Sequence, residues 1–141
     1  MKAALFLAVS VLVLGCASMQ TTPVQAPDPV EDITSALSGF HAAMEAEDTE
    51  GMLAWVSNDY SDDQGLNKTA LKGYLESLIA QGVFSSMEAD VSNCQVVVDG
   101  NMPTASPVIY ASYMGLTQFR IEWKKEADGS WKILSHNQIW Q

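Results

Sequence analysis

Acidic and histidine side chains are the residues of this sequence that could do acid–base or metal chemistry. Asp59, Asp62 and Asp63 lie in one short polar segment, and His41 and His136 are the two histidines. Clustered carboxylates can bind a hard cation such as Ca²⁺, but this segment lacks the ligand and glycine spacing of an EF-hand loop. We therefore expect a solvated acidic loop without a metal, and two histidines that do not converge on one site.

The two cysteines offer less chemistry. Cys94 has no histidine near it in the sequence, so we expect a small buried apolar residue rather than a nucleophile. Two cysteines cannot form a disulfide framework. The sequence shows no Ser–His–Asp arrangement and no phosphate-binding glycine loop, and we expect no cofactor.

The charge balance excludes one class of partner. The chain has 141 residues, with 17 Asp and Glu against 7 Lys and Arg, so its formal net charge is −10. Such a surface repels nucleic acid and anionic lipid. The length suits one domain with a substantial core. We therefore expect no nucleic-acid partner and no electrostatic attachment to a membrane.

The first residues have the pattern of an export signal. Lys2 is followed by a short apolar run that ends at residue 14, too short for a comfortable membrane-spanning helix. The segment Leu-Val-Leu-Gly-Cys, which ends at Cys16, resembles the lipobox of bacterial lipoproteins. The resemblance implies that Cys16 is acylated and becomes the mature first residue, and that Ala17 directs the protein to the periplasmic face of the outer membrane.

These features divide the chain into three parts. Residues 1–15 are predicted to be a signal peptide. Residues 16–30 are predicted to be the lipidated cysteine and an extended tether, because three prolines fall in a weakly charged stretch without helical or strand period. Residues 31–141 form the predicted folded domain, which lipid on Cys16 would hold at the membrane.

Three amphipathic helices are predicted to open the domain. Apolar residues recur at helical spacing in three successive segments. Asp48 or Thr49 can cap the second helix, Asn67 can cap the third, and Gly82 can end it. The apolar residues are Ile33, Leu37, Phe40 and Met44; Met52, Leu53 and Val56; and Leu71, Tyr74, Leu75, Leu78 and Ile79.

After residue 85 the apolar period changes from about four to two, which indicates strands. We expect them at 86–98, 105–113, 116–124 and 131–140, with Pro107 at an edge or bulge. An Asp-Gly pair at residues 128–129 is a hairpin turn signal. The prediction is an α+β domain whose helices cover one face of an antiparallel sheet.

Two local motifs carry a resemblance to a known superfamily. The segment 47–53, Glu-Asp-Thr-Glu-Gly-Met-Leu, follows Phe40 at the end of the first helix, and residues 128–133 read Asp-Gly-Ser-Trp-Lys-Ile. Both are similar to motifs of the nuclear transport factor 2-like superfamily. The resemblance spans residues 31–141 and implies a cone-shaped fold, with three N-terminal helices packed on a curved, mainly antiparallel sheet of four or more strands. The superfamily holds enzymes, ligand binders and assembly modules, so the fold alone does not define the function.

A hairpin register that pairs Trp123 with Trp131 and Ile121 with Ile133 sets apolar residues opposite one another. In such a cone, this register predicts an apolar pocket with a few polar groups, the common pattern of a ligand site. The alternative is that the same aromatic side chains only fill the core. The predicted lining is Phe40, Met44, Trp55, Tyr74, Thr117, Phe119, Ile121, Trp123, Trp131, Ile133, Ser135 and Asn137.

The resemblance also allows an enzyme. Steroid isomerases of this superfamily use a first-helix tyrosine as oxyanion donor and a carboxylate base, and the tyrosine position falls on Phe40, which has no hydroxyl. The base position falls at Asp62 or Asp63, and His41 is a weaker candidate by analogy with dehydratases. No residue stands out as catalytic.

The opposite sheet face is a candidate dimer interface. Cone-fold proteins commonly dimerise through this face, and an exposed tryptophan beside a leucine is a reasonable anchor. The residues are Gln118, Arg120, Leu134, His136 and Trp140. Three hypotheses remain: a lipid-anchored domain that binds a small apolar ligand or a protein partner, an isomerase or lyase of the same fold, and an assembly subunit that acts through its sheet face.

Overall fold

The computed structural model of the chain describes residues 28–100 and 102–139. In this part of the chain there are three α-helices, one short 3₁₀ helix and five β-strands. They are α1 (Pro29–Glu45), α2 (Thr49–Ala54), α3 (Lys68–Ala80), η1 (Phe84–Ser86), β1 (Glu88–Asp90), β2 (Gln95–Val97), β3 (Thr104–Ser112), β4 (Gly115–Lys125) and β5 (Trp131–Gln138). The predicted signal peptide and Cys16 lie outside the described residues.

Side-chain caps begin the helices close to where the sequence predicts them. The Asp48 carboxylate accepts a backbone N–H at the start of α2, and the Asn67 side chain does the same for α3. Gly82 follows α3 with a φ of 69°, a left-handed conformation that glycine adopts without strain. Helix α1 begins at Pro29, two residues before the predicted start of the folded domain, because Asp28 caps it and proline suits a first helical turn.

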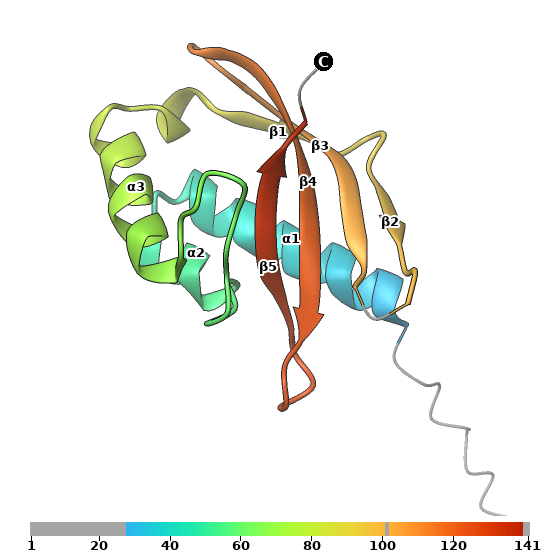
Figure 1. Ribbon diagram of the computed structural model, residues 1–141. Coiled ribbons are helices and arrows are strands. Elements are labelled where there is room, and N and C mark those ends of the chain that lie inside the picture. Colours follow the sequence, from blue (N-terminus) through green and yellow to red (C-terminus); the bar gives the residue numbers. More distant parts are fainter. Residues whose placement is uncertain (1–27, 101, 140–141) are drawn as a thin grey trace, which may run out of the picture.

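The strands form one antiparallel sheet in the order β1–β3–β4–β5, with β2 also pairing with β3. Figure 1 shows α1 lying across one face of this sheet, with α2 and α3 on the side of β5. The described chain is therefore α+β, with three helices and a mostly antiparallel five-stranded sheet, as the sequence predicts. The expected strand 86–98 is instead η1, β1 and β2, because a turn at residues 91–94 interrupts it.

The β4–β5 hairpin has a different register from the predicted one. Trp123 pairs with Ile133, and Ile121 pairs with His136, rather than with Trp131 and Ile133 respectively. The register shifts at residue 134, which is one extra residue in β5. A single extra residue turns every later side chain of the strand to the other face. The prediction was wrong for two reasons. The hairpin is shorter than predicted, with Lys125 opposite Trp131, which moves the partner of Trp123 by two residues. The bulge, which alternation alone does not reveal, moves the partner of Ile121 by one residue more.

One core lies between α1 and the inner face of the sheet. Ile33 of α1 and Ala105, Ile121 and Trp123 of the sheet have no exposed surface, and Ile133 is 1% exposed. Burying a large apolar side chain contributes about 1.5–3 kcal/mol. We call these five residues the filled core, because they occupy the space between α1 and the hairpin end of the sheet.

The segment after α2 covers the edge of β5. Val56 bridges Ile133 in parallel, with the Ser57 N–H donating to the Ile133 carbonyl at 2.9 Å and the Ile133 N–H donating to the Trp55 carbonyl at 2.8 Å. Trp55 packs on α1 at Gly39, where an added Cβ would come 2.3 Å from the indole. These contacts fix the path of the acidic loop that follows. No helix in the described part of the chain combines the length and apolarity needed to cross a membrane.

Candidate functional site

A cavity of about 210 Å³ lies beside the filled core. Its walls come from three helices (α1, α3 and η1), from the loop that follows α2, and from the parts of β3, β4 and β5 that lie away from the β4–β5 turn. Phe40 and Met44 of α1 form one side, and Leu71, Leu75 and Leu78 of α3 face them. The lining is mainly apolar, since most of the residues that form it are aliphatic or aromatic.

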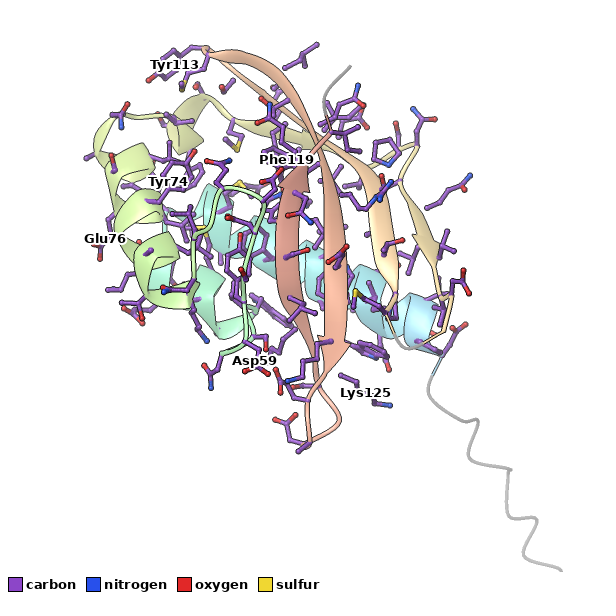
Figure 2. The ribbon with its side chains drawn as sticks, in the orientation of Figure 1. Asp59, Tyr74, Glu76, Tyr113, Phe119 and Lys125 are labelled. Atoms are coloured by element: carbon purple, nitrogen blue, oxygen red, sulfur yellow. The ribbon has the colours of Figure 1, made fainter. Side chains whose placement is uncertain are left out.

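Exposed apolar side chains mark the mouth of the cavity. Tyr74 of α3 is 45% exposed and Met114 of the β3–β4 hairpin is 66% exposed, and both line the cavity. Figure 2 shows Tyr74 on α3, Phe119 on β4 and Tyr113 at the tip of the hairpin. The Tyr113 hydroxyl donates to the Gln81 carbonyl at 3.2 Å, which joins this tip to the end of α3. The cavity is therefore open at one end and bounded by protein at the other.

Tyr60 and Asp62 form the main polar pair of the wall. The buried Tyr60 hydroxyl donates to Asp62 Oδ2 at 3.0 Å, and both residues line the cavity. Asp62 Oδ1 accepts the backbone N–H groups of Gln64 at 3.0 Å and Leu66 at 2.8 Å. Burial, followed by the Asp62 charge, raises the pKa of Tyr60 above its ordinary value, so this hydroxyl keeps its proton. The loop thus presents one fixed carboxylate at the cavity.

The other two acids of the loop point elsewhere. Asp63 Oδ2 accepts the Gln138 N–H at 3.2 Å, outside the cavity lining. Asp59 pairs with Lys124 near the β4–β5 hairpin, and Figure 2 shows it at the opposite end of the molecule from Tyr113. The three carboxylates therefore diverge. Among the described residues, no three His, Cys, Asp or Glu side chains gather as a metal site needs.

His136 lines the cavity, whereas the sequence placed it on the opposite sheet face. The bulge at residue 134 is the physical reason, because it brings His136 onto the face of Ile121. Its half-buried ring packs against Phe119 with centroids 4.3 Å apart. Its Nε2 is enclosed and has no hydrogen-bond partner among the described residues. Burial and then His41 lower the pKa of His136 to about 4, against a smaller opposing effect of Asp62.

His41 approaches the same region from α1. Its Nε2 lies 3.0 Å from the Tyr110 hydroxyl, and the two rings meet edge to face. Tyr110 also packs against His136, with ring centroids 5.7 Å apart. Burial lowers the pKa of His41 to about 4, so both imidazoles are neutral at neutral pH. The expectation that the histidines do not converge was wrong, since both pack on Tyr110.

Six of the twelve predicted lining residues lie at the cavity, and six lie elsewhere. Ser135 donates to Glu122 on the outer face, and Asn137 donates to Ser135. These two were misplaced by the same bulge. The residues at the cavity are Phe40, Met44, Tyr74, Thr117, Phe119 and Ile133, and those elsewhere are Trp55, Ile121, Trp123, Trp131, Ser135 and Asn137.

Sequence reasoning missed Tyr60, Tyr110, His136 and Gln138, which all line the cavity. Tyr60 lies inside a segment that was interpreted as a solvated loop, although it is only 3% exposed. A tyrosine between acidic residues was the available signal. His136 and Gln138 could not be found without the bulge, because strict alternation assigns both to the outer face.

The remaining predicted residues have simple positions. Gln118, Arg120 and Leu134 belong to β4 and β5, and the carbonyl of Leu134 accepts the Ser61 N–H of the covering loop. Trp140 lies outside the described residues. Cys94 is half-buried against the core, and burial raises the pKa of its thiol against a smaller opposing effect of the Ser106 N–H.

No family model and no curated protein matches the chain. Solved structures do match. A protein of unknown function with a cystatin-like fold from Nostoc punctiforme is 16% identical, with a TM-score of 0.61 over 77% of this chain and 87% of that one. A nuclear transport factor 2-like protein of unknown function from Shewanella baltica is 14% identical, with a TM-score of 0.62 over 81% and 97% of the two chains.

A candidate ketosteroid isomerase from Shewanella frigidimarina is also similar, at 15% identity and a TM-score of 0.58 over 74% of this chain and 92% of that one. At such identities the likeness concerns the fold. The domain therefore has the nuclear transport factor 2-like, cystatin-like fold that its motifs suggested.

Proposed function

We propose that this protein is a lipid-anchored, periplasmic domain that binds a small, mainly apolar molecule in the cavity between α1, α3 and the sheet. The observation that carries the proposal is the open cavity of about 210 Å³ with an apolar lining. An apolar protein cavity of about 150 Å³ already holds a molecule the size of benzene. A few placed polar groups in an apolar lining are the usual pattern of a ligand site.

Two features favour binding over mere packing. Tyr74 and Met114 leave apolar surface exposed at the mouth, and this exposure has a cost that a ligand would relieve. In addition, Tyr60 and Asp62 are fixed by hydrogen bonds within the wall. A wall whose polar groups are already oriented loses little entropy when a ligand binds.

The test is fluorescence titration with N-phenyl-1-naphthylamine, an uncharged dye that brightens in apolar sites. We expect saturable binding by the wild type and loss of binding in Leu78→Trp, because Leu78 lines the cavity and an indole there would occupy it. Val97→Trp is the matched control, because Val97 is 51% exposed on β2 and remote from the lining. Equal binding by both variants would place the dye elsewhere and overturn the proposal.

The anchor is a separate element of the proposal and rests on the lipobox-like residues before Cys16. Mass spectrometry of the protein from a bacterial membrane fraction should find acyl groups on Cys16. Cys16→Ser should move the protein out of that fraction. A Cys16→Ser protein that stays acylated and membrane-bound would contradict lipid anchoring.

A second candidate function is an isomerase or lyase, favoured by the position of Asp62 in the cavity wall and by the fold shared with a candidate ketosteroid isomerase. Asp62 Oδ2 would accept a proton from carbon beside a carbonyl. Phe40 offers no hydroxyl on α1 to stabilise the enolate. This weakness is why we favour binding without catalysis.

Hydrogen exchange separates the two candidates. Exchange of the α-hydrogens of 2-tetralone in deuterated water, followed by NMR, would be accelerated by a catalytic carboxylate and lost in Asp62→Asn. We expect wild type and variant to exchange at the buffer rate. Acceleration that depends on Asp62 would replace binding by catalysis as the function.

We further propose a homodimer through the outer sheet face. The proposal rests on the exposed Arg120 of β4 and on Leu134, the half-buried extra residue of the bulge in β5, while His136 lies on the inner face. Light scattering should report a dimer for the wild type, and Leu134→Glu should shift it to a monomer if that face carries the interface. An unchanged dimer would move the interface elsewhere.

A further inference from the structure

The charge of the cavity restricts what it can hold. Asp62 is the one acidic residue that lines it, and among the described residues the lining has no Lys or Arg. The two histidines that meet at Tyr110 are neutral at neutral pH. A ligand with a carboxylate or phosphate would therefore meet a negative wall without a compensating cation, which is unfavourable in a partly desolvated site.

Asp62 has an unused acceptor position. Oδ1 accepts two backbone N–H groups and Oδ2 accepts the Tyr60 hydroxyl, whereas a carboxylate offers about four acceptor positions. None of the ion pairs among the described residues includes Asp62. The carboxylate is thus held rigidly by neutral donors and has no cationic partner of its own.

Aromatic rings line the same cavity as Asp62. Tyr60, Tyr74 and Phe119 all line it with Asp62. The face of an aromatic ring attracts a cation, and a carboxylate beside several rings is a suitable receptor for an ammonium group. The whole domain adds to this preference, because from residue 28 onward 17 acidic residues stand against 6 basic ones, a net charge of −11.

We propose that the ligand of this cavity is a small hydrophobic amine, whose ammonium group pairs with Asp62 in the cavity wall while its apolar body lies between α1, α3 and the sheet. This inference rests on the proposed binding function and names its ligand class. A neutral alcohol of the same shape would fill the cavity but would make only an ordinary hydrogen bond to Asp62. An acid of the same shape would be excluded.

Three indoles of one shape test the proposal: tryptamine, tryptophol and indole-3-acetate, which carry a positive, a neutral and a negative head. Calorimetric titration of the purified domain at neutral pH should rank them in that order. We expect tryptamine to bind about tenfold tighter than tryptophol, the difference between a charge-assisted and a neutral hydrogen bond. Indole-3-acetate should bind more weakly than both.

Asp62→Asn should make tryptamine and tryptophol bind equally, while tryptophol keeps its wild-type affinity. Asparagine can still accept the N–H groups of Gln64 and Leu66 through its Oδ1, so the loop should keep its shape. Asp63→Asn is the matched control, because it removes the same charge from the neighbouring residue, outside the lining. It should preserve the preference for tryptamine.

The outcomes separate the two proposals. If tryptophol binds the wild type but not Leu78→Trp, and tryptamine binds no tighter, the cavity is a ligand site and the amine proposal alone is overturned. If Asp62→Asn and Asp63→Asn lose the preference for tryptamine equally, the preference comes from the general surface charge. That result would also overturn the amine proposal. If none of the indoles binds, the binding function fails as well. Should Asp62→Asn not fold, the ranking of the three indoles on the wild type still decides.

Discussion

The filled core and the cavity lie side by side against the same helix, yet one is solid and the other hollow. Trp123, Ile121 and Ala105 are completely buried where the sheet meets the first half of α1. Farther along β4 and β5, Phe119 and Gln138 are only half-buried, and the cavity opens there. The bulge at residue 134 marks the change between the two regions.

This difference assigns two roles to two regions of the fold: the filled core stabilises the domain, and the cavity is the proposed binding site. The filled core is closely packed and excludes water, so each of its large apolar side chains contributes its full hydrophobic free energy. The hydrophobic free energy is smaller at the cavity end of the domain. There α3 stands away from the sheet, and its leucines line the cavity instead of packing against strand residues. Substitutions in the two regions should therefore differ in size and in sign.

The largest expected effect is that of Trp123→Ala. Truncating a fully buried tryptophan to alanine lowers the free energy of unfolding by about 3–5 kcal/mol, because the surrounding side chains fill the resulting cavity only in part. Phe119→Ala should cost much less, about 1–2 kcal/mol, because one side of its ring already borders a cavity. Urea unfolding followed by circular dichroism measures both. Equal losses would mean that the two regions are packed alike.

The histidines between the two regions should give the next largest effect. His41 and His136 have a pKa of about 4 in the folded domain against 6.5 when unfolded, so the unfolded chain binds more protons between these values. The contribution of each histidine to the free energy of unfolding should be complete above pH 6.5 and fall by about 3 kcal/mol as the pH is lowered to 4. The expected sign follows from burial, which disfavours the imidazolium.

Unfolding free energies measured at several pH values check this. The double variant His41→Gln, His136→Gln should lose most of the fall between pH 6.5 and 4. A wild type that is equally stable at both pH values would show that the histidines are solvated, and would contradict their position beside Tyr110.

The sequence predicted the elements better than the site. Helix caps at Asp48 and Asn67 and the strand alternation in β4 are local signals, and the structure confirms the class of fold that they predict. The lining depends on which face each β5 residue takes, and one extra residue at the bulge reverses that assignment for His136. Nothing local in the sequence distinguishes a bulge from a regular strand.

The predicted pocket aromatics show the same limit. Trp55 and Trp123 have the residue type and spacing expected of pocket walls, but neither lines the cavity. Trp55 packs directly on Gly39 of α1, and Trp123 is buried within the filled core. Which large side chain fills a space and which borders one depends on how the helices lie on the sheet, a property of tertiary packing.

A smaller effect is expected from Gly39→Ala on the filled side. The new Cβ would lie 2.3 Å from the indole of Trp55, closer than any stable contact, so the ring or the helix must move. Overpacking of this kind costs about 2 kcal/mol. Thermal unfolding should show the loss, and the partner variant Gly39→Ala, Trp55→Leu should recover part of it. An unchanged melting temperature for Gly39→Ala would show that Trp55 does not pack on α1.

The smallest effect has the opposite sign and comes from the cavity side. Gly73 lies exposed within α3, and a Cβ there would meet no atom within 4 Å. Replacing glycine by alanine in a helix interior stabilises by about 0.5–1 kcal/mol, since it removes conformational freedom from the unfolded chain. Gly73→Ala should therefore raise the melting temperature slightly and leave dye binding unchanged, because residue 73 does not line the cavity. A stabilised variant with lost binding would instead mean that the cavity opens through movement of α3, and that this wall is not fixed.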